Sequence, residues 1–234
     1  MPVPTLITPT TIERIAWEGA LSSSAERYGS SDGATKVTLG QPTHWTPQAL
    51  EALTGTKWAA PANGRLHTLI RLDSTLHPPA ATQRYRDATL IAAMRPIGSD
   101  GRALAHDLLP QRKLAEEQGK FTIKLAPSFK FADGSGIEAG EASVEIQHHN
   151  AYPTIQAFGL GEDNPYWQFS RHDTQPLLGT QSVYLVASLP AAAVALRLKI
   201  ALLATVESNR FGLSRLLTPD TANSQLNFNL PMHL

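Results

Sequence analysis

The run from 194 to 206, VALRLKIALLATV, constrains the fold more than any other segment because apolar residues recur at every second position. Arg197, Lys199 and Thr205 fall between them. Successive side chains of an extended chain point to opposite sides, so this pattern predicts a strand with one face on a hydrophobic core and the other facing water. The two basic residues near its centre exclude a membrane-spanning helix here.

The same alternation recurs in shorter segments, and most of the chain is expected to be extended. It is clearest in 120–125 and 141–147. Further expected strands are 35–39, 66–72, 87–95, 154–158, 166–170, 182–189 and 225–230. About ten strands with short connections favour antiparallel pairing. The sequence therefore predicts a mainly β fold, an antiparallel two-sheet β-sandwich with the jelly roll among its candidate arrangements, and short helices in its loops.

The amino-terminal segment predicts a helical arm. Thr10 and Glu13 have the spacing of a capping box, which starts a helix over 11–28. Ile12, Ile15 and Trp17 form its apolar stripe, although glycine and serine residues weaken the helix further along. A Gly- and Ser-containing stretch ends at Gly33. We therefore expect an arm, 1–33, that docks on a β-sandwich domain, 34–234, or on a neighbouring subunit.

Two short helices are expected in the loops. Pro47 follows Thr46 as a first-turn proline follows a cap, and Gly55 supplies a stop, so 47–54 is predicted to be helical. Residues 111–118, QRKLAEEQ, lie between a proline and a glycine and predict a polar surface helix.

Composition narrows the compartment and the partners. Hydrophobic residues make up 42% of the chain and charged residues 17%, which predicts a folded core. Twenty basic residues balance twenty acidic ones, so no global field attracts nucleic acid or an anionic membrane. Neither a secretory signal nor a long apolar run is found. These features favour a soluble cytoplasmic protein that does not insert into membranes.

Signatures of catalysis and of metal binding are missing from the sequence. The chain has no cysteine, which removes disulfides and thiolate zinc sites. His148 and His149 are adjacent, so on a strand they point to opposite faces and do not chelate one ion. No Gly-x-Ser-x-Gly elbow or phosphate-binding loop occurs. We expect no metal, no cofactor and no enzymatic activity.

An aromatic cluster and a basic region offer two alternative functions. On the strand 166–170, Trp167 and Phe169 share one face, which is typical of core residues, and Tyr166 takes the other. Exposed beside Arg171, such a cluster would serve as a platform for a sugar ring in a carbohydrate-binding or sugar-active protein. The arginines between 65 and 102 would serve a nucleic-acid-associated subunit.

The preferred interpretation is recognition or assembly without catalysis. It rests on the missing catalytic signatures and on a separable arm, so the expected partner is another protein or a second copy in a larger complex. The candidate binding residues are Ile12, Ile15, Trp17, Tyr166, Trp167 and Arg171.

Overall fold

The computed structural model of the chain describes residues 5–7, 12–22, 35–54, 58–59, 63–81, 83–113, 120–124, 130–131, 143–147, 154–172, 176–208, 214–219 and 226–232. Within them the chain is mainly β and its main sheet is antiparallel, as predicted. The described residues contain one helix, α1 (Pro47–Thr54). None of the described residues belongs to a helix long and apolar enough to cross a membrane.

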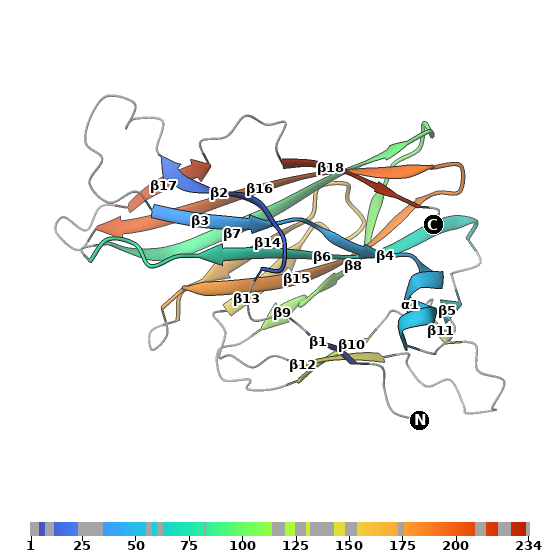
Figure 1. Cartoon of the computed structure of the whole chain (residues 1–234), viewed down its shortest axis with the longest axis horizontal. Coiled ribbons are helices and arrows are strands. Elements are labelled where there is room, and N and C mark those ends of the chain that lie inside the picture. The colour runs from blue at the N-terminus through green and yellow to red at the C-terminus, as the bar shows by residue number, and fades with distance from the viewer. Residues whose placement is uncertain are drawn as a thin grey trace.

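Thirteen strands form one large sheet that folds into two layers, seen as stacked ribbons in Figure 1. The first layer contains β8 (Leu104–Leu109), β15 (Gly179–Pro190), β6 (Arg65–Leu76), β3 (Thr35–Gly40), β2 (Ile15–Ser22) and β4 (Thr43–Trp45). The second contains β16 (Ala195–Ser208), β7 (Gln83–Ile97), β14 (Tyr166–Ser170), β13 (Thr154–Phe158), β9 (Arg112–Lys113) and β18 (Asn227–Pro231). Strand β17 (Ser214–Pro219) pairs with β2 and with β16 and so joins the layers.

The hydrophobic core lies between the two layers. Strand β16 supplies Leu196, Leu198, Ile200 and Leu202, each at most 3% exposed. The intervening Arg197 and Lys199 are exposed, so the strand predicted from the alternation in 194–206 is confirmed with the expected faces. Apolar side chains of β6, β7, β14 and β15 complete the same cluster.

Among the described residues of the predicted amino-terminal helix, 12–22, none is helical. Residues 15–22 form strand β2, which pairs with β3 in the large sheet. A Cβ on Gly19 would lie only 2.6 Å from the nearest ring atom of Trp17. The Trp17 side chain packs against the core. A glycine that weakens a helix therefore leaves room for this tryptophan on a strand, and tertiary pairing overrides the local capping signal. The boundary at 33/34 stays a prediction.

The two predicted loop helices have different outcomes. Helix α1 has the predicted bounds, and Oγ1 of Thr46 accepts a 3.3 Å hydrogen bond from the amide of Ala49, as expected of a cap. In the second segment Arg112 and Lys113 instead form β9, which pairs with β13. The rest of that predicted helix lies outside the described residues.

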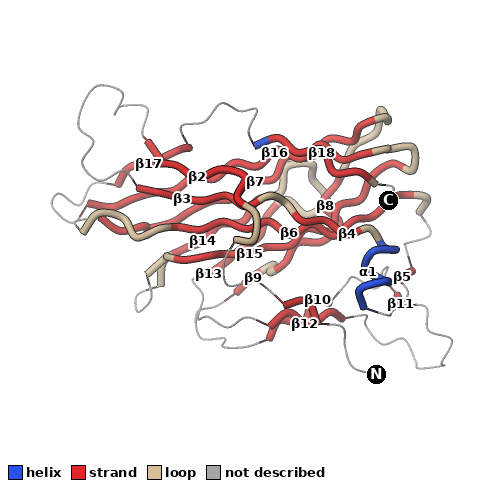
Figure 2. The backbone as a smooth tube through the Cα atoms, in the orientation of Figure 1, coloured by secondary structure: helices blue, strands red, loops and turns tan. Residues whose placement is uncertain are grey.

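Two small sheets lie apart from the large one in the view of Figure 2. In the first, β12 (Ser143–Gln147) lies between β1 (Thr5–Ile7) and β10 (Lys120–Lys124). In the second, β11 (Lys130–Phe131) pairs with β5 (Trp58–Ala59). Strands β10 and β12 lie in segments where the sequence predicts strands, whereas β1 has no such signal.

Candidate functional site

A polar cleft of about 670 Å³ opens on the first layer, where segments distant in sequence converge. Glu13 and Arg14 precede β2, residues 41–44 include the turn into β4, and Arg71 and Asp73 come from β6. Residues 227–231 of β18 complete its wall. The sequence reasoning missed this cleft because it depends on long-range strand pairing.

Arg71 organises the floor of this cleft. Its side chain is 7% exposed, its Nε donates a 3.1 Å hydrogen bond to Oδ2 of Asp73, and its Nη2 donates a 2.9 Å bond to Oε2 of Glu13. Its guanidinium carbon lies 5.9 Å from the ring centroid of Trp45, within the range of a cation–π contact. The buried cation is therefore matched by two carboxylates and an aromatic ring.

The protonation of this network follows from burial and pairing. Burial raises the pKa of Asp73, although hydrogen bonds from Ser182 and Arg71 oppose that effect. Burial would lower the pKa of Arg71, but the charge of Asp73 and the bond to Glu13 outweigh it and raise that pKa. The guanidinium therefore stays charged. Because Asp73 already accepts bonds from Arg71 and Ser182, its carboxylate is not a free general base on the floor.

Two histidines form a second titratable pair in the same layer. The rings of His67 on β6 and His106 on β8 meet edge to face, with centroids 5.0 Å apart and an interplanar angle of 74°. Burial and the neighbouring His106 lower the pKa of His67 to about 4, and burial also lowers the pKa of His106. Within the described residues, no group of three or more His, Asp or Glu side chains could hold a metal ion.

The candidate residues on β14 do not form a binding platform. Trp167 is fully buried in the core. Tyr166 is 36% exposed and stacks on Phe158, with ring centroids 4.9 Å apart. Arg171 forms an ion pair with Glu207 at 3.6 Å. Of the two aromatic faces that the sugar-platform interpretation considers, the one with Trp167 and Phe169 is therefore inaccessible.

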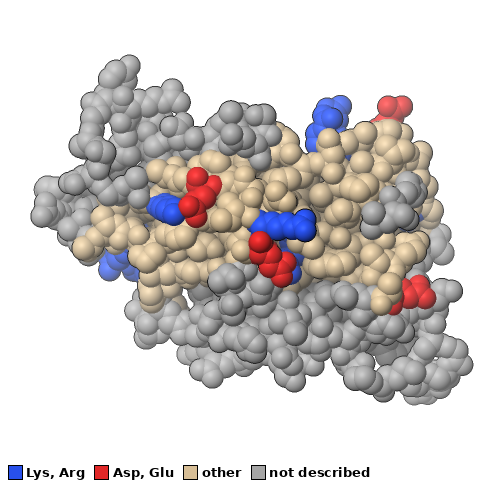
Figure 3. All heavy atoms as spheres, in the orientation of Figure 1, with Lys and Arg blue, Asp and Glu red and all other residues tan. Residues whose placement is uncertain are grey.

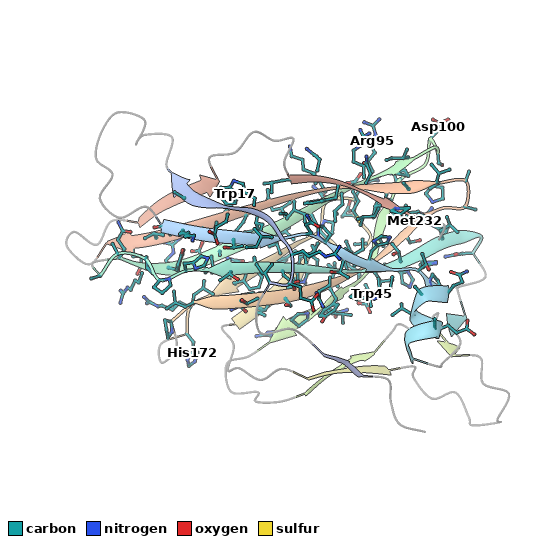
Figure 4. All side chains as sticks on the ribbon, viewed as in Figure 1. Trp17, Trp45, Arg95, Asp100, His172 and Met232 are labelled. Atoms are coloured by element: carbon teal, nitrogen blue, oxygen red, sulfur yellow. The ribbon has the colours of Figure 1, made fainter. Side chains whose placement is uncertain are left out.

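The candidates near the amino terminus lie on other elements. Ile12 is half-buried before β2, Ile15 is 55% exposed at the start of β2, and Trp17 packs against the core. Figure 4 places Trp17 and Trp45 at well-separated points along the sheets. The structure thus brings the six predicted binding residues into no common site.

The arginines between 65 and 102 do not form a basic surface either. Arg71 is buried, Arg84 pairs with Glu207 at 3.0 Å, and Arg102 pairs with Asp163 at 3.2 Å. Figure 3 shows basic and acidic side chains side by side on the visible face. Paired charges of this kind do not provide the positive field on which a nucleic-acid-binding surface depends.

The three-stranded sheet is the second candidate site. Strand β10 pairs with β12 in antiparallel register, from Lys120 opposite Gln147 to Lys124 opposite Ser143. Directly opposed positions share a face of a sheet. Phe121 and Ile123 are therefore on the same face as their partners at 146 and 144, which are Ile and Val. The positions between them form the other face, which is wholly polar.

Three solved structures match the chain at low TM-scores, and one of them is described as a pore forming protein. No family model and no curated protein matches the chain. A structure described as a pore forming protein matches with a TM-score of 0.43 and 6% identity over 88% of this chain and 92% of its own. Clostridium perfringens delta-toxin matches with a TM-score of 0.35 and 9% identity over 92% of this chain and 89% of its own. The Clostridium perfringens NetB toxin in its membrane inserted form matches with a TM-score of 0.34 and 6% identity over 77% of this chain and 92% of its own.

These matches contradict the functional expectations drawn from the sequence. The sequence favoured a soluble, cytoplasmic subunit for assembly or recognition, with carbohydrate or nucleic-acid binding as alternatives, and it excluded membrane insertion. These expectations conflict with neighbours described as a pore forming protein and as a toxin in its membrane inserted form. A long apolar run is expected of a membrane-spanning helix and not of a strand, because a strand needs only every second residue to be apolar to contact lipid. The TM-scores are low and these identities do not exceed 9%, so the proposed function is argued from this chain's own strands.

Proposed function

We propose that this chain is a pore-forming protein that leaves the cell producing it and assembles from several copies on a target membrane. In this proposal, each copy inserts the segment 120–147 as one long β-hairpin. The observation that carries it is the register of β10 and β12, because this register opposes apolar to apolar and polar to polar positions.

The register also predicts the turn of the inserted hairpin. Paired residue numbers add to the same value along the whole β10–β12 ladder. Continued without a shift, this register brings residue 132 opposite 135 and leaves Asp133–Gly134 as a two-residue loop. Asp-Gly is a preferred sequence for the type I′ turn that closes a two-residue hairpin. The turn chemistry and the observed register therefore agree.

The length of such a hairpin suits a bilayer. Its limbs would be 120–132 and 135–147, which at roughly 3.3 Å per residue span roughly 43 Å. Tilted by about 45°, each limb rises about 30 Å, which matches the hydrocarbon core of a membrane. The segment is thus long enough to cross without further residues.

The faces of the extended hairpin suit one side in lipid and the other in water. Apolar residues of the first limb share one face: Phe121, Ile123, Leu125, Phe129 and Phe131. Pro127 interrupts this row and removes one amide donor from the ladder. Glu138 falls on the same face, four residues beyond the turn, so it would lie near the far surface of the bilayer. The opposite face carries three lysines and two glutamates, at 120, 124, 130, 141 and 145.

The present structure corresponds to a state before insertion. Lys130 lies opposite Ala59 and Phe131 opposite Trp58 in the β11–β5 pair. In the extended register the same two residues would instead pair with 137 and 136. Insertion therefore requires β11 to separate from β5, a pair of only two residues on each side.

Release of a trapped dye tests this function. We would add the purified chain to calcein-loaded vesicles of phosphatidylcholine and cholesterol, and to erythrocytes. Ile123→Lys places a charge on the lipid face between the near surface and the midplane, where the cost per copy rises from about 0–1 kcal/mol at the surface to about 2–4 kcal/mol at the midplane. Because every copy in the pore bears this cost, release should fall at least tenfold. Thr122→Lys, on the polar face of the same strand, is the matched control and should retain release. Failure of the unaltered chain on both membranes, or equal release by the two variants, would overturn the proposal.

A further inference from the structure

We propose that Lys130 selects the ions that pass through the pore, and that the pore conducts chloride in preference to potassium. This inference rests on the proposed pore-forming function and adds the class of solute that the pore prefers and the residue that selects it. In the present structure Lys130 lies in β11, opposite Ala59 of β5. In the inserted hairpin the same position would belong to the face that lines the water-filled lumen.

Five charged residues occupy the lumen face of the extended hairpin. Three are basic and two are acidic, so each copy adds one net positive charge to the lumen. Every position repeats in each copy, so each of these residues becomes a ring of like charges around the pore axis. From the near surface to the far surface the rings alternate in sign and end on a lysine, in the order Lys120, Glu145, Lys124, Glu141 and Lys130.

The rings in the near half of the lumen largely cancel. Lys124 is opposite Ser143 in the β10–β12 register, so positions 141 and 145 are its diagonal neighbours on the same face. Both of these positions carry glutamate. Diagonal neighbours in a sheet are about 7–8 Å apart, within reach of long side chains. Two lysines therefore alternate with two glutamates there, and this half of the lumen has no net charge.

The lysine in the far half has no such neighbours. The register, continued without a shift, gives Lys130 only serine, alanine or isoleucine at the nearest positions of the lumen face: 128, 132, 135, 137 and 139. The Lys130 ring is therefore the one ring within the span whose charge no adjacent carboxylate of the hairpin offsets. A cationic ring in a lumen with walls of low dielectric constant attracts anions and repels cations.

The two remaining acidic residues of the hairpin lie outside the lumen. Glu138 is on the lipid-facing side, and Asp133 is in the turn at the far mouth. Asp133 follows Lys130 by three residues, which at roughly 3.3 Å per residue and a tilt of about 45° is about 7 Å along the pore axis. This is close to the screening length of about 8–10 Å. Asp133 therefore reduces the preference for chloride, but its charge is in bulk water and does not cancel the ring.

Reversal potentials in planar bilayers test this assignment. We would form channels from the full chain in bilayers of phosphatidylcholine and cholesterol, with unequal potassium chloride on the two sides, and derive the permeability ratio of chloride to potassium. For the unaltered chain we expect a ratio of roughly two to five. Lys130→Gln should bring the ratio close to one, because the remaining lumen rings cancel. Lys130→Glu should invert the preference.

A thiol at the same position tests the ring in channels that have already formed. The chain has no cysteine, so Lys130→Cys provides a single reactive thiol. We expect a methanethiosulfonate reagent with a trimethylammonium group to raise the ratio, and one with a sulfonate group to lower it below one. Phe131→Cys is the matched control, because the next position faces lipid. Neither reagent should change the ratio of that variant.

The outcomes separate the ring from the pore. A ratio at or below one for the unaltered chain, or an unchanged ratio in the Lys130 variants, would overturn the role of Lys130 and leave pore formation standing. Equal effects of the reagents at positions 130 and 131 would overturn it as well, because the two positions would then not face opposite sides. Absence of channels, together with absence of dye release from vesicles and erythrocytes, would overturn pore formation itself.

Discussion

Ser182 donates a 2.6 Å hydrogen bond to Oδ1 of Asp73 from the directly opposed position on the neighbouring strand. The other carboxylate oxygen accepts a 3.1 Å bond from Nε of Arg71, so both oxygens of a nearly inaccessible side chain are satisfied. The same guanidinium reaches Glu13, which lies before β2. Asp73 and Arg71 therefore connect the amino-terminal segment to β6 and β15 through buried charge.

Removal of the buried cation should be much more damaging than removal of an exposed one. Arg71→Ala leaves Asp73 buried without its counter-charge, and breaking a buried pair in this way costs about 3–5 kcal/mol of unfolding free energy. Arg102 pairs with Glu162 and Asp163, but its side chain is 62% exposed, so Arg102→Ala should cost at most about 1 kcal/mol. Urea unfolding of both variants measures the difference, and similar losses would contradict the role given to Arg71.

The two faces of β16 give a second contrast between adjacent residues. Leu198 is fully buried between the layers, whereas Lys199 is exposed. Leu198→Ala should lower the unfolding free energy by about 2–5 kcal/mol through lost burial and a cavity. Lys199→Ala should cost little, because it removes neither packing nor a buried charge. Thermal melting of the pair checks this, and equal melting temperatures would contradict the assigned core face.

Period-two patterning predicted the strands that have one buried face. The segments 154–158 and 166–170 have the observed bounds of β13 and β14, and β16 was found from its alternation. Strand β2 was missed because its apolar residues also fit a helical stripe, and a capping box precedes it. Its pairing with β3 and β17 decides between strand and helix, and pairing partners are not encoded locally.

The candidate sites depend on contacts that a single sequence does not reveal. Arg71 and Glu13 are far apart in the chain, and nothing in either segment indicates that their side chains meet. The alternation in 120–125 and 141–147 was detected and predicted two half-buried strands. The proposal that these two strands insert as one hairpin depended on the register between them, which is a product of tertiary structure.

The turn between β13 and β14 provides a test of backbone constraint. Gly159 has φ = 86°, and a Cβ there would be 2.9 Å from Cα of Pro165. Gly161 has φ = 80°, but a Cβ on it meets nothing within 4 Å. Gly161→Ala should therefore cost about 1–2 kcal/mol from the left-handed backbone alone. Gly159→Ala adds a clash with backbone and should cost clearly more, as the order of the two melting temperatures would reveal.

The buried His67, which lies against His106, should make the fold sensitive to mild acid. Because the pKa of His67 is lowered to about 4 in the fold, while an unfolded histidine titrates near about 6.5, the unfolded chain binds more protons between these values. The contribution of His67 is therefore present above that window and is lost as the pH falls through it. His67→Gln should flatten the dependence of unfolding free energy on pH between 6.5 and 4.5, measured by urea unfolding. Parallel curves for the unaltered chain and the variant would show that the His67 site does not resist protonation.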